Sequence, residues 1–482
     1  MLVDSPITAS IAAPQFDNDR PGLTKLRETL SSFGQIHLLQ FWDQLSDADR
    51  NGLVDQIAGI DFNQLQRLML ADTRSEDCLN LTERVDVPPV ATMAELNADR
   101  IAGESLLRRQ CVGVLIVAGG EGSRLGFDGA KGCFPIGPVS NASLYQILLE
   151  KVVATASRFQ VTIPVFLMTS PTTHNASVAF LDEFDWFGIP HSARHVFCQG
   201  TMPVVGLDQR ILMESPSQIC FSPDGHGGVL PALSRNGQLD VMQQSGIEHL
   251  FYCQIDNPVV PLLDPELLGA HARADSQVTI LVIEKISPQQ RTGTVMSIAG
   301  RTHILEYSLI PPEIAEQRNA DGSLRFRTAN TGIHILSSRF LQDQANRPES
   351  LPFHRAIKAV AHVNDDGQLH QPTQPNAIKF ERFIFDIFPQ ATRTLLIERP
   401  QDEVFVPLKD AGSSESSPTA VRQQMSRLHR RWLEQAGVSL PPDLVIEISP
   451  LFATNAVQVA ERLAESSGLL AQPIKDGSLL VQ

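Results

Sequence analysis

The sequence predicts an α/β protein built on a mainly parallel sheet with helices on both faces. From residue 112 onward, continuous apolar runs typical of fully buried strands alternate with helical patterns. Sheets of this type bind ligands at the carboxyl ends of their strands, so polar or glycine-rich segments that follow a strand are the expected place for a site. The predicted strands are Val112–Val117, Pro164–Met168, Val196–Cys198, His249–Cys253 and Val278–Ile283.

The first part of the chain, to about residue 105, is predicted to be mainly helical. Apolar residues recur at helical spacing over Leu23–Phe33, and Gly34 follows as a stop. A second helical pattern covers Leu38–Leu45, and Ser46 is placed as the N-cap of a further helix. This region carries no chemical motif, so we interpret it as an accessory part.

Capping residues mark two later helices. Ser143 and Gln146 form a capping box, and Ser417 precedes Pro418 as N-cap and first helical residue of a helix that closes at Gly437. These patterns divide the chain into three expected parts. They are a mainly helical region (residues 1–105), a central α/β domain expected to carry the site (residues 106–390) and a small C-terminal α/β domain (residues 391–482).

Composition narrows the function classes. The 482 residues include 54 acidic and 39 basic ones, a formal net charge of −15. Sequence-independent binding of nucleic acid needs a basic face, which argues against a nucleic-acid partner. A protein with this charge that binds polyphosphate must gather its few cations locally.

The sequence also favours a soluble, cytoplasmic protein. Met1–Pro14 lacks the basic start of a signal peptide, and the apolar run Val112–Ala118 is far shorter than the roughly 20 residues of a membrane helix. No membrane partner is expected. The six cysteines form no CxxC pair, so we interpret them as free thiols in a reducing compartment.

One segment carries a clear chemical signal. The strand Val112–Val117 runs directly into Ala118–Gly126, which contains four glycines, and glycine-rich turns after strands let backbone N–H groups approach phosphate. Leu125 stands where a dinucleotide fingerprint needs glycine, and no register supplies the G-K-[ST] of a P-loop. Arg124 and Lys131 add cations, which suits a triphosphate whose β and γ phosphates leave as pyrophosphate.

At this loop the sequence resembles the eukaryotic-type UDP-N-acetylhexosamine pyrophosphorylases, and further motifs follow in the family's order. A single loop would be weak support, whereas seven ordered motifs with an additional N-terminal one are strong support. The matching segments are Gly34–Trp42, Val117–Gly132, Pro223–Gly228, Gln254–Asn257, Glu306–Tyr307, Thr328–Asn330, Pro375–Phe388 and Phe405–Lys409.

The resemblance implies a Rossmann-like, mixed but mostly parallel sheet of the nucleotidyltransferase type, similar to glycosyltransferase-A folds. It implies a uridylyltransferase that forms a UDP-sugar and pyrophosphate from UTP and a sugar 1-phosphate by in-line attack on the α-phosphorus. N-acetylglucosamine 1-phosphate is the expected sugar. A UTP–glucose-1-phosphate or broad UDP-sugar pyrophosphorylase is the alternative, and an inactive nucleotide-sugar-binding protein is a more distant one.

The resemblance also assigns roles to single residues. The groups expected to hold phosphates and stabilise departing pyrophosphate are Arg124, Lys131, Lys379 and Lys409. Both Lys379 and Lys409 follow apolar stretches, where a solvated lysine is less expected. Asp256, at the end of a predicted strand, is the expected ligand of Mg²⁺, the one cofactor that the family implies.

Two further sets are expected to hold the nucleotide and the sugar. The nucleotide set is Ala118, Gly119, Gly120, Gly122, Gln199, Gly225 and His226. The sugar set is Gly293, Glu306, Tyr307, Asn330, Phe383 and Phe385. The two phenylalanines are read as alternating on a strand, where they either line an acetyl pocket or belong to the core. Without the family, Gln199 reads as an ordinary surface-loop glutamine.

Four positions depart from the family pattern. Glu121 replaces a neutral residue beside the phosphates, Ala130 replaces a proline, and His226 stands where asparagine is usual. Thr294 follows Gly293 in place of an apolar β-branched residue. These changes bear on nucleotide and sugar preference more than on the reaction class.

Overall fold

The computed structural model describes residues 20–70, 85–91, 99–412, 414–465 and 477–482, and its chain forms two compact units. Each unit is assembled from segments that are far apart in the sequence. Unit 1 combines Met1–Ser75, Thr201–Ser222 and Phe353–Phe380, and unit 2 combines Glu76–Gly200, Pro223–Pro352 and Glu381–Gln482. The three-part division expected from the sequence stays a prediction.

Unit 1 joins N-terminal helices to small sheets around an apolar core that includes Leu30, Leu53, Leu65 and Phe380. Its helices are α1 (Arg20–Ser32), α2 (Asp47–Ala58) and α3 (Phe62–Leu70), with 3-10 turns η1 (Ile36–Leu39) and η2 (Trp42–Gln44). Its strands are β6 (Thr201–Pro203), β7 (Val205–Gly206), β8 (Met213–Ser215), β9 (Gln218–Ile219), β10 (Phe221–Pro223), β16 (His354–Lys358), β17 (His362–Val363), β18 (Leu369–His370) and β19 (Ala377–Glu381).

The prediction for Leu38–Leu45 is wrong in detail, because this segment forms the two 3-10 turns rather than an α-helix. Tertiary bonds explain the difference. The Gln35 side chain donates to the Gln209 carbonyl at 2.9 Å and accepts from the Ile211 N–H at 2.9 Å. His37 Nε2 lies 2.8 Å from the Ile211 carbonyl. These bonds fix the chain in a tight turn that its apolar spacing alone does not reveal.

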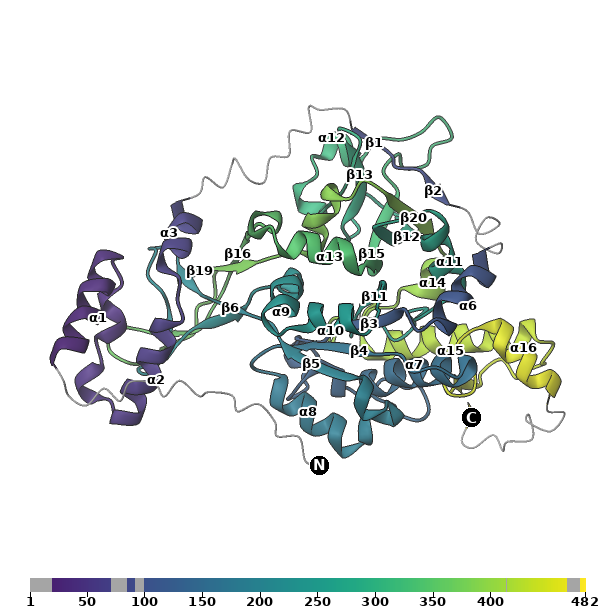
Figure 1. Ribbon diagram of the computed structural model, residues 1–482, viewed down its shortest axis with the longest axis horizontal. Coiled ribbons are helices and arrows are strands. Elements are labelled where there is room, and N and C mark those ends of the chain that lie inside the picture. Colours follow the sequence, from purple (N-terminus) through teal and green to yellow (C-terminus); the bar gives the residue numbers. More distant parts are fainter. Residues whose placement is uncertain (1–19, 71–84, 92–98, 413, 466–476) are drawn as a thin grey trace. The chain divides into compact units, whose positions relative to one another are not determined.

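Unit 2 contains the predicted α/β sheet (Figure 1). Its eight-strand path runs β2 (Val90–Ala91), β20 (Thr394–Glu398), β12 (Val278–Glu284), β15 (Thr328–Ser337), β11 (His249–Gln254), β3 (Val112–Val117), β4 (Val165–Thr169) and β5 (Arg194–Cys198). Only β15 runs antiparallel to its neighbours on this path. The remaining strands β1 (Val85–Asp86), β13 (Thr294–Ile298) and β14 (Arg301–Leu305) extend the sheet. The predicted mixed, mostly parallel sheet is therefore confirmed.

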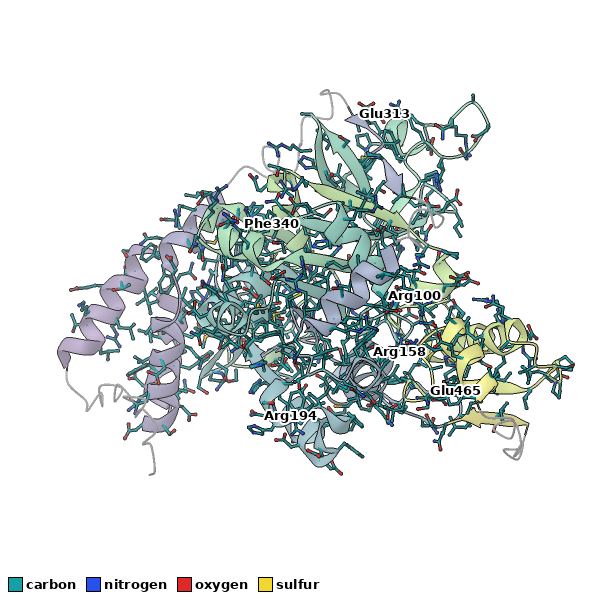
Figure 2. All side chains as sticks on the ribbon, turned by 45° about the vertical axis from the view of Figure 1, so that its right-hand side comes forward. Arg100, Arg158, Arg194, Glu313, Phe340 and Glu465 are labelled. Carbon is teal, nitrogen blue, oxygen red and sulfur yellow. The ribbon has the colours of Figure 1, made fainter. Side chains whose placement is uncertain are left out.

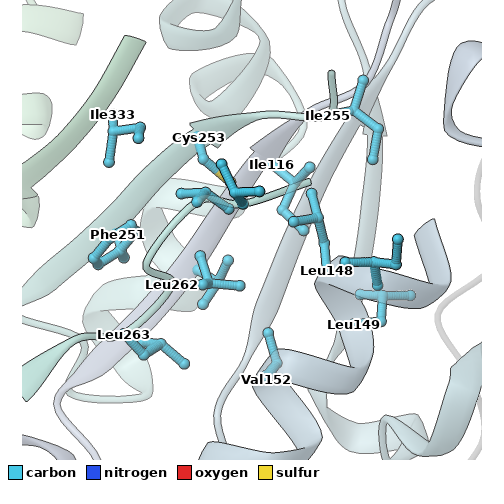
Figure 3. Packing of buried hydrophobic residues seen from close by; sticks show 14 of the residues in the cluster. Ile116, Leu148, Leu149, Val152, Phe251, Cys253, Ile255, Leu262, Leu263 and Ile333 are labelled. Atoms are coloured by element: carbon cyan, nitrogen blue, oxygen red, sulfur yellow. The ribbon is translucent and has the colours of Figure 1, made fainter. Parts of the chain in front are cut away.

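Helices cover both faces of this sheet. All six residues of β3 are buried, and successive side chains point into two different apolar clusters. The first cluster holds α6 (Arg100–Arg108), α7 (Leu144–Phe159), α8 (His174–Glu183), α11 (Pro265–Arg273), α14 (Gln401–Val404) and α15 (Pro418–Gln435). The second holds α9 (Val229–Arg235), α10 (Gln238–Gln244), α13 (Ser338–Ala345) and the 3-10 helix η11 (Ile384–Gln390). Figure 3 shows Ile116 and Cys253 packed near Leu148 on the first face, and Figure 2 labels Phe340 of α13, which belongs to the second.

Outside these layers lie α12 (Pro312–Ala315) and a C-terminal group in which β21 (Val445–Ile448) pairs in parallel with β22 (Ser478–Val481) beside α16 (Ala456–Glu465). The first part of the chain, expected to be mainly helical, also contains the two short strands β1 and β2. β1 pairs with β13 and β2 with β20, so long-range pairing decides their structure.

Helix starts follow their predicted caps. The hydroxyl oxygens of Ser46, Ser143 and Ser417 accept backbone N–H bonds at the starts of α2, α7 and α15. The Gln146 Nε2 group donates to Glu150 at 2.8 Å, a bond within α7.

Two expectations drawn from composition, on the cysteines and on membrane helices, can be compared with the structure. Among the cysteines that the structure describes, all five are free thiols, and Cys78 lies outside the described residues. Within the described ranges, no helix is both long and apolar enough to cross a membrane.

Candidate active site

The glycine-rich segment folds back on itself directly after β3. We call residues 118–131 the glycine loop. The Ala118 N–H donates to the Met168 carbonyl at 2.7 Å, and the Lys131 N–H closes the loop on the Gly120 carbonyl at 3.0 Å. A Cβ at Gly119 would lie 2.5 Å from Oε1 of Gln199. The predicted nucleotide residues Gly119 and Gln199 are thus brought into contact by the carboxyl ends of neighbouring strands β3, β4 and β5.

Lys131 and Asp256 form the charged centre of this region. Asp256 follows β11, which runs parallel to β3, so both segments emerge at the same edge of the sheet. Lys131 Nζ lies 3.6 Å from Asp256 Oδ2, and their side chains are 15% and 16% exposed. The two opposite charges are therefore mostly shielded from solvent and lie within ion-pairing distance of each other.

A third segment joins these two. We call residues 404–411, which follow β20, the bridging segment. The Leu408 N–H donates to the Asp256 carbonyl at 2.8 Å, and the Ala411 N–H donates to the Arg124 carbonyl at 3.0 Å. Arg124, Asp256 and Lys409, predicted from three distant motifs, therefore share one hydrogen-bonded framework.

Lys409 itself differs from the sequence-based expectation. Its side chain is exposed, although a solvated lysine was not expected there, and Nζ lies 6.0 Å from the Phe405 ring centroid. The apolar residues before it, including Val406 and Leu408, are buried and leave the lysine at the surface end of the segment. Lys379 is half-buried on β19 of unit 1, so it is not among the groups that unit 2 brings together.

The predicted uracil-binding turn is shaped around glycine. Gly225 has a φ of +81°, and a Cβ there would lie 2.5 Å from the Arg382 carbonyl oxygen. His226 begins the 3-10 helix η8 (His226–Gly228), and its Nδ1 accepts the Ile384 N–H at 3.4 Å. The imidazole lies 5.4 Å from the Phe383 ring and 5.5 Å from the Phe385 ring. The histidine that departs from the family pattern therefore packs on the predicted sugar aromatics.

Sequence reasoning missed Asp224 in this turn. Its carboxyl group is buried, and its carbonyl accepts the Arg382 N–H at 2.8 Å. Burial raises the pKa of Asp224 to about 6, while the nearby Arg382 and Arg235 act in the opposite direction. An acidic residue inside a glycine-rich motif after a strand was the available signal.

The predicted sugar residues gather where β15 bulges. The Asn330 N–H donates to the Gly293 carbonyl at 2.8 Å, and the Asn330 Oδ1 accepts the Gly332 N–H at 3.1 Å. Glu306 Oε1 lies 3.5 Å from the place of a Cβ on Gly293. Asn330, Gly293 and Glu306 therefore meet. Tyr307 lies next to Glu306 in the 3-10 turn η9 (Tyr307–Leu309) and is exposed.

Phe383 and Phe385 do not alternate on a strand, so that prediction is wrong. Phe383 caps η11 and Phe385 lies inside it. The Asp386 N–H donates to the Phe383 carbonyl at 3.1 Å, a three-residue bond that winds the chain. The rings stack with centroids 5.1 Å apart, and Phe385 is buried while Phe383 is half-buried. Phe385 thus belongs to the core, and Phe383 lies at its margin.

The other departures have structural explanations. Glu121 is exposed, and its backbone pairs with that of Ala130 across the glycine loop. Ala130 is buried there. Thr294 Oγ1 accepts from the buried Lys285 ammonium group at 3.0 Å, a bond that an apolar residue would not offer.

A metal ion has a narrow set of protein donors here. In the part of the chain that the structure describes, no group of three or more His, Cys, Asp or Glu side chains is close enough to hold a metal. Mg²⁺ is commonly bound through one or two carboxylates together with substrate phosphates, so Asp256 alone fits that ion once a nucleotide is bound.

Comparison with known proteins shows the family to which the chain belongs. A family model described as UTP–glucose-1-phosphate uridylyltransferase matches residues 60–449. The chain belongs to this family. Within the uridylyltransferase family, it is 32% identical over 464 residues to UDP-N-acetylhexosamine pyrophosphorylase-like protein 1 of Xenopus tropicalis, covering 88% of this chain and 91% of that one. It is 30% identical over 475 residues to UDP-N-acetylglucosamine diphosphorylase 2 of Arabidopsis thaliana, covering 94% and 92%.

A solved structure agrees with the fold. The crystal structure of the uridine diphosphate N-acetylglucosamine pyrophosphorylase from Trypanosoma brucei, in complex with an inhibitor, superposes with a TM-score of 0.80 at 23% identity, covering 95% of this chain and 98% of that one. The family-level prediction is therefore confirmed, and the likeness to this structure supports the fold.

Proposed function

We propose that the protein is a uridylyltransferase that makes UDP-N-acetylglucosamine and pyrophosphate from UTP and N-acetylglucosamine 1-phosphate. The observation that carries the proposal is the Lys131–Asp256 pair, at the carboxyl ends of the parallel strands β3 and β11 and directly beside a glycine loop. Family membership and the names of the relatives from Xenopus and Arabidopsis support the reaction and the sugar.

The proposed reaction is one in-line displacement. A phosphate oxygen of the sugar 1-phosphate forms a bond to the α-phosphorus of UTP, while the bond from that phosphorus to the bridging oxygen of pyrophosphate breaks. Such a transfer depends on positioning and on neutralising charge. Lys131 and Arg124 bind the departing pyrophosphate, whereas Lys409 binds the phosphates at the point of attack.

Magnesium is part of the proposal. When bound, Mg²⁺ neutralises charge on the reacting phosphates and holds them in line. Asp256 would hold it, because its carboxylate lies beside Lys131 of the glycine loop and its carbonyl accepts a bond from the bridging segment. Lys131, whose Nζ lies 3.6 Å from Asp256 Oδ2, would stand beside the same phosphates.

The remaining groups select the substrates. Gln199 and the Gly225 backbone bind the uracil edge, and Ala118, Gly119, Gly120 and Gly122 allow the nucleotide to approach closely. Asn330, Glu306 and the Gly293 backbone bind hydroxyl and amide groups of the sugar. Phe383 contacts the acetyl group, while the buried Phe385 supports it. We place the protein in the cytoplasm.

A second candidate sugar is glucose 1-phosphate, because the family model carries that sugar in its description. The test is pyrophosphate release from UTP and Mg²⁺ with N-acetylglucosamine 1-phosphate, N-acetylgalactosamine 1-phosphate and glucose 1-phosphate. Preference for an acetylated sugar supports the proposal. Turnover of glucose 1-phosphate alone keeps the reaction and replaces the sugar. Binding of UDP-sugar by folded protein without any release of pyrophosphate would identify a nucleotide-sugar-binding protein.

A further inference from the structure

Asn257 lies directly behind the proposed metal carboxylate and bonds to a distant part of the chain. Its side chain is 3% exposed. The Nδ2 group donates to the Val404 carbonyl at 2.7 Å, and Oδ1 accepts the Val406 N–H at 3.1 Å. A primary amide that donates to one residue and accepts from the next but one imitates a neighbouring strand, so it holds this backbone in a single register.

The backbone position fixed at Val404 and Val406 also determines where the residues that follow them lie, Lys409 included. Two residues further on, the Leu408 N–H donates to the Asp256 carbonyl at 2.8 Å, and Lys409 follows. The Ala411 N–H then donates to the Arg124 carbonyl at 3.0 Å. Lys409 therefore lies between two attachments of the bridging segment, one to the Asp256 carbonyl and one to the glycine loop.

The segment around Asp256, residues 255–260, is itself held by buried contacts. Ile255, just before Asp256, is buried in the cluster drawn in Figure 3. The buried Lys151 ammonium group of α7 donates to the carbonyls of Pro258 at 2.7 Å and Val260 at 2.9 Å. Asn257 is thus anchored to a rigid support, and the bridging segment is the part that it can place.

We propose that Asn257 is a positioning residue that fixes the bridging segment and thereby sets Lys409 and Arg124 relative to the Asp256 carboxylate. The inference rests on the proposed function. Asn257 touches no substrate in this account and acts through Lys409. A misplacement of reacting groups by about 1 Å can cost about a hundredfold in rate, so the amide should matter although it is buried.

The test compares Asn257→Ala and Asn257→Asp with wild type. The aspartate keeps the size and an acceptor for the Val406 N–H, yet it cannot donate to the Val404 carbonyl. Both variants should lower kcat by about 10- to 100-fold while KM for UTP stays within a few-fold. The matched control is Asn236→Ala, because the Asn236 amide also donates to a carbonyl, that of Ala232 at 2.8 Å, but within its own helix end. The control should leave kcat unchanged.

A double-mutant cycle with Lys409→Ala tests whether Asn257 changes kcat through Lys409. If Asn257 acts through Lys409, the Lys409→Ala substitution costs much less in the Asn257→Ala background than in wild type. Additive losses would overturn the proposal. So would unchanged kcat in both Asn257 variants.

Two readouts do not depend on turnover. Deuterium exchange should rise in residues 404–411 of the Asn257 variants and stay at wild-type levels in α7. Equal exchange in the bridging segment would overturn the proposal. Calorimetric binding of UTP without metal should stay within a few-fold of wild type in the Asn257 variants, and a large loss of binding would overturn the proposal. If wild type releases no pyrophosphate, the proposed function fails, whereas these two measurements still decide the role of Asn257.

Discussion

The proposed phosphate end and the proposed sugar end of the candidate site are built in different ways. At the phosphate end, the glycine loop and Asp256 follow directly from the parallel strands β3 and β11, and backbone bonds tie them to the bridging segment. At the sugar end, Asn330 sits on an irregular stretch of the antiparallel β15, and Phe383 caps a 3-10 helix.

This difference separates reaction from specificity. The segments proposed to bind the phosphates are positioned largely by backbone hydrogen bonds, which most side-chain substitutions leave intact. The residues proposed to bind the sugar are side chains on irregular elements, where a single substitution changes the shape or polarity of the site. We therefore expect the nucleotidyl-transfer reaction to be robust and the sugar preference to be adjustable.

The largest expected effect is at the phosphate end. Asp256→Asn removes a carboxylate without changing size and should lower pyrophosphate release at least about a hundredfold, as for loss of a group that stabilises the transition state. The same change at the exposed Asp128 of the glycine loop is the control. Near-normal turnover of the Asp256 variant at saturating Mg²⁺ would mean that the metal is held elsewhere.

A smaller and more selective effect is expected at the sugar end. Asn330→Ala should raise KM for the sugar 1-phosphate by about tenfold, the equivalent of one or two hydrogen bonds, and leave KM for UTP within twofold. Steady-state kinetics with each substrate varied in turn measures both. Asn319→Ala, in an exposed turn, should change neither. An equal rise in both KM values would indicate that the irregular part of β15 had rearranged.

The two phenylalanines should separate by burial. Phe385→Leu should lower the free energy of unfolding by about 1–2 kcal/mol, because the ring is buried in the core, while Phe383→Leu should cost less. Urea denaturation measures both values. Conversely, Phe383→Leu should have the larger effect on KM for the sugar 1-phosphate. If Phe385→Leu has the larger kinetic effect, the assignment of core and pocket rings must be reversed.

The smallest effect concerns the turn between the two ends. The pKa of Asp224 is raised in the folded protein to about 6 from an ordinary value of 3.8. The folded state therefore holds this proton more tightly, so the stabilisation is full below about pH 4 and is lost as the pH rises through about 6. Asp224→Asn should reduce the gain in Tm that wild type shows between about pH 7.5 and about pH 5. Thermal unfolding at both values tests this, with Asp128→Asn as the control. An undiminished gain would exclude Asp224 as the source.

Local signals explain what the sequence predicted well. The strand Val112–Val117 is an unbroken apolar run, and Ser46, Ser143 and Ser417 cap helices through bonds within three residues. The glycine loop was identifiable because its residues are contiguous. Its link to Lys409 was not, since that link consists of backbone bonds between segments far apart in the sequence.

Long-range contacts explain the failures. Gln35 and His37 hold the Leu38–Leu45 segment in 3-10 turns through residues 209–211, and no pattern within eight residues reveals that. Phe383 and Phe385 have the spacing of a strand, yet the 3-10 turn that places them packs on His226, more than 150 residues earlier. The composition of unit 1 likewise depends on long-range contacts, because the unit combines three separated segments.

The irregularity in β15 also constrains how the chain can change length. Val282 pairs with Asn330 and Leu281 with Ile333, so β15 carries two residues, Thr331 and Gly332, that have no counterpart on β12. Side chains alternate along a strand with a period of two. Deleting both residues would keep every later side chain on its own face, whereas deleting one would turn half of the strand inside out. Length variation at this point is therefore expected in pairs, and a paired deletion would reshape the setting of Asn330 while sparing the core.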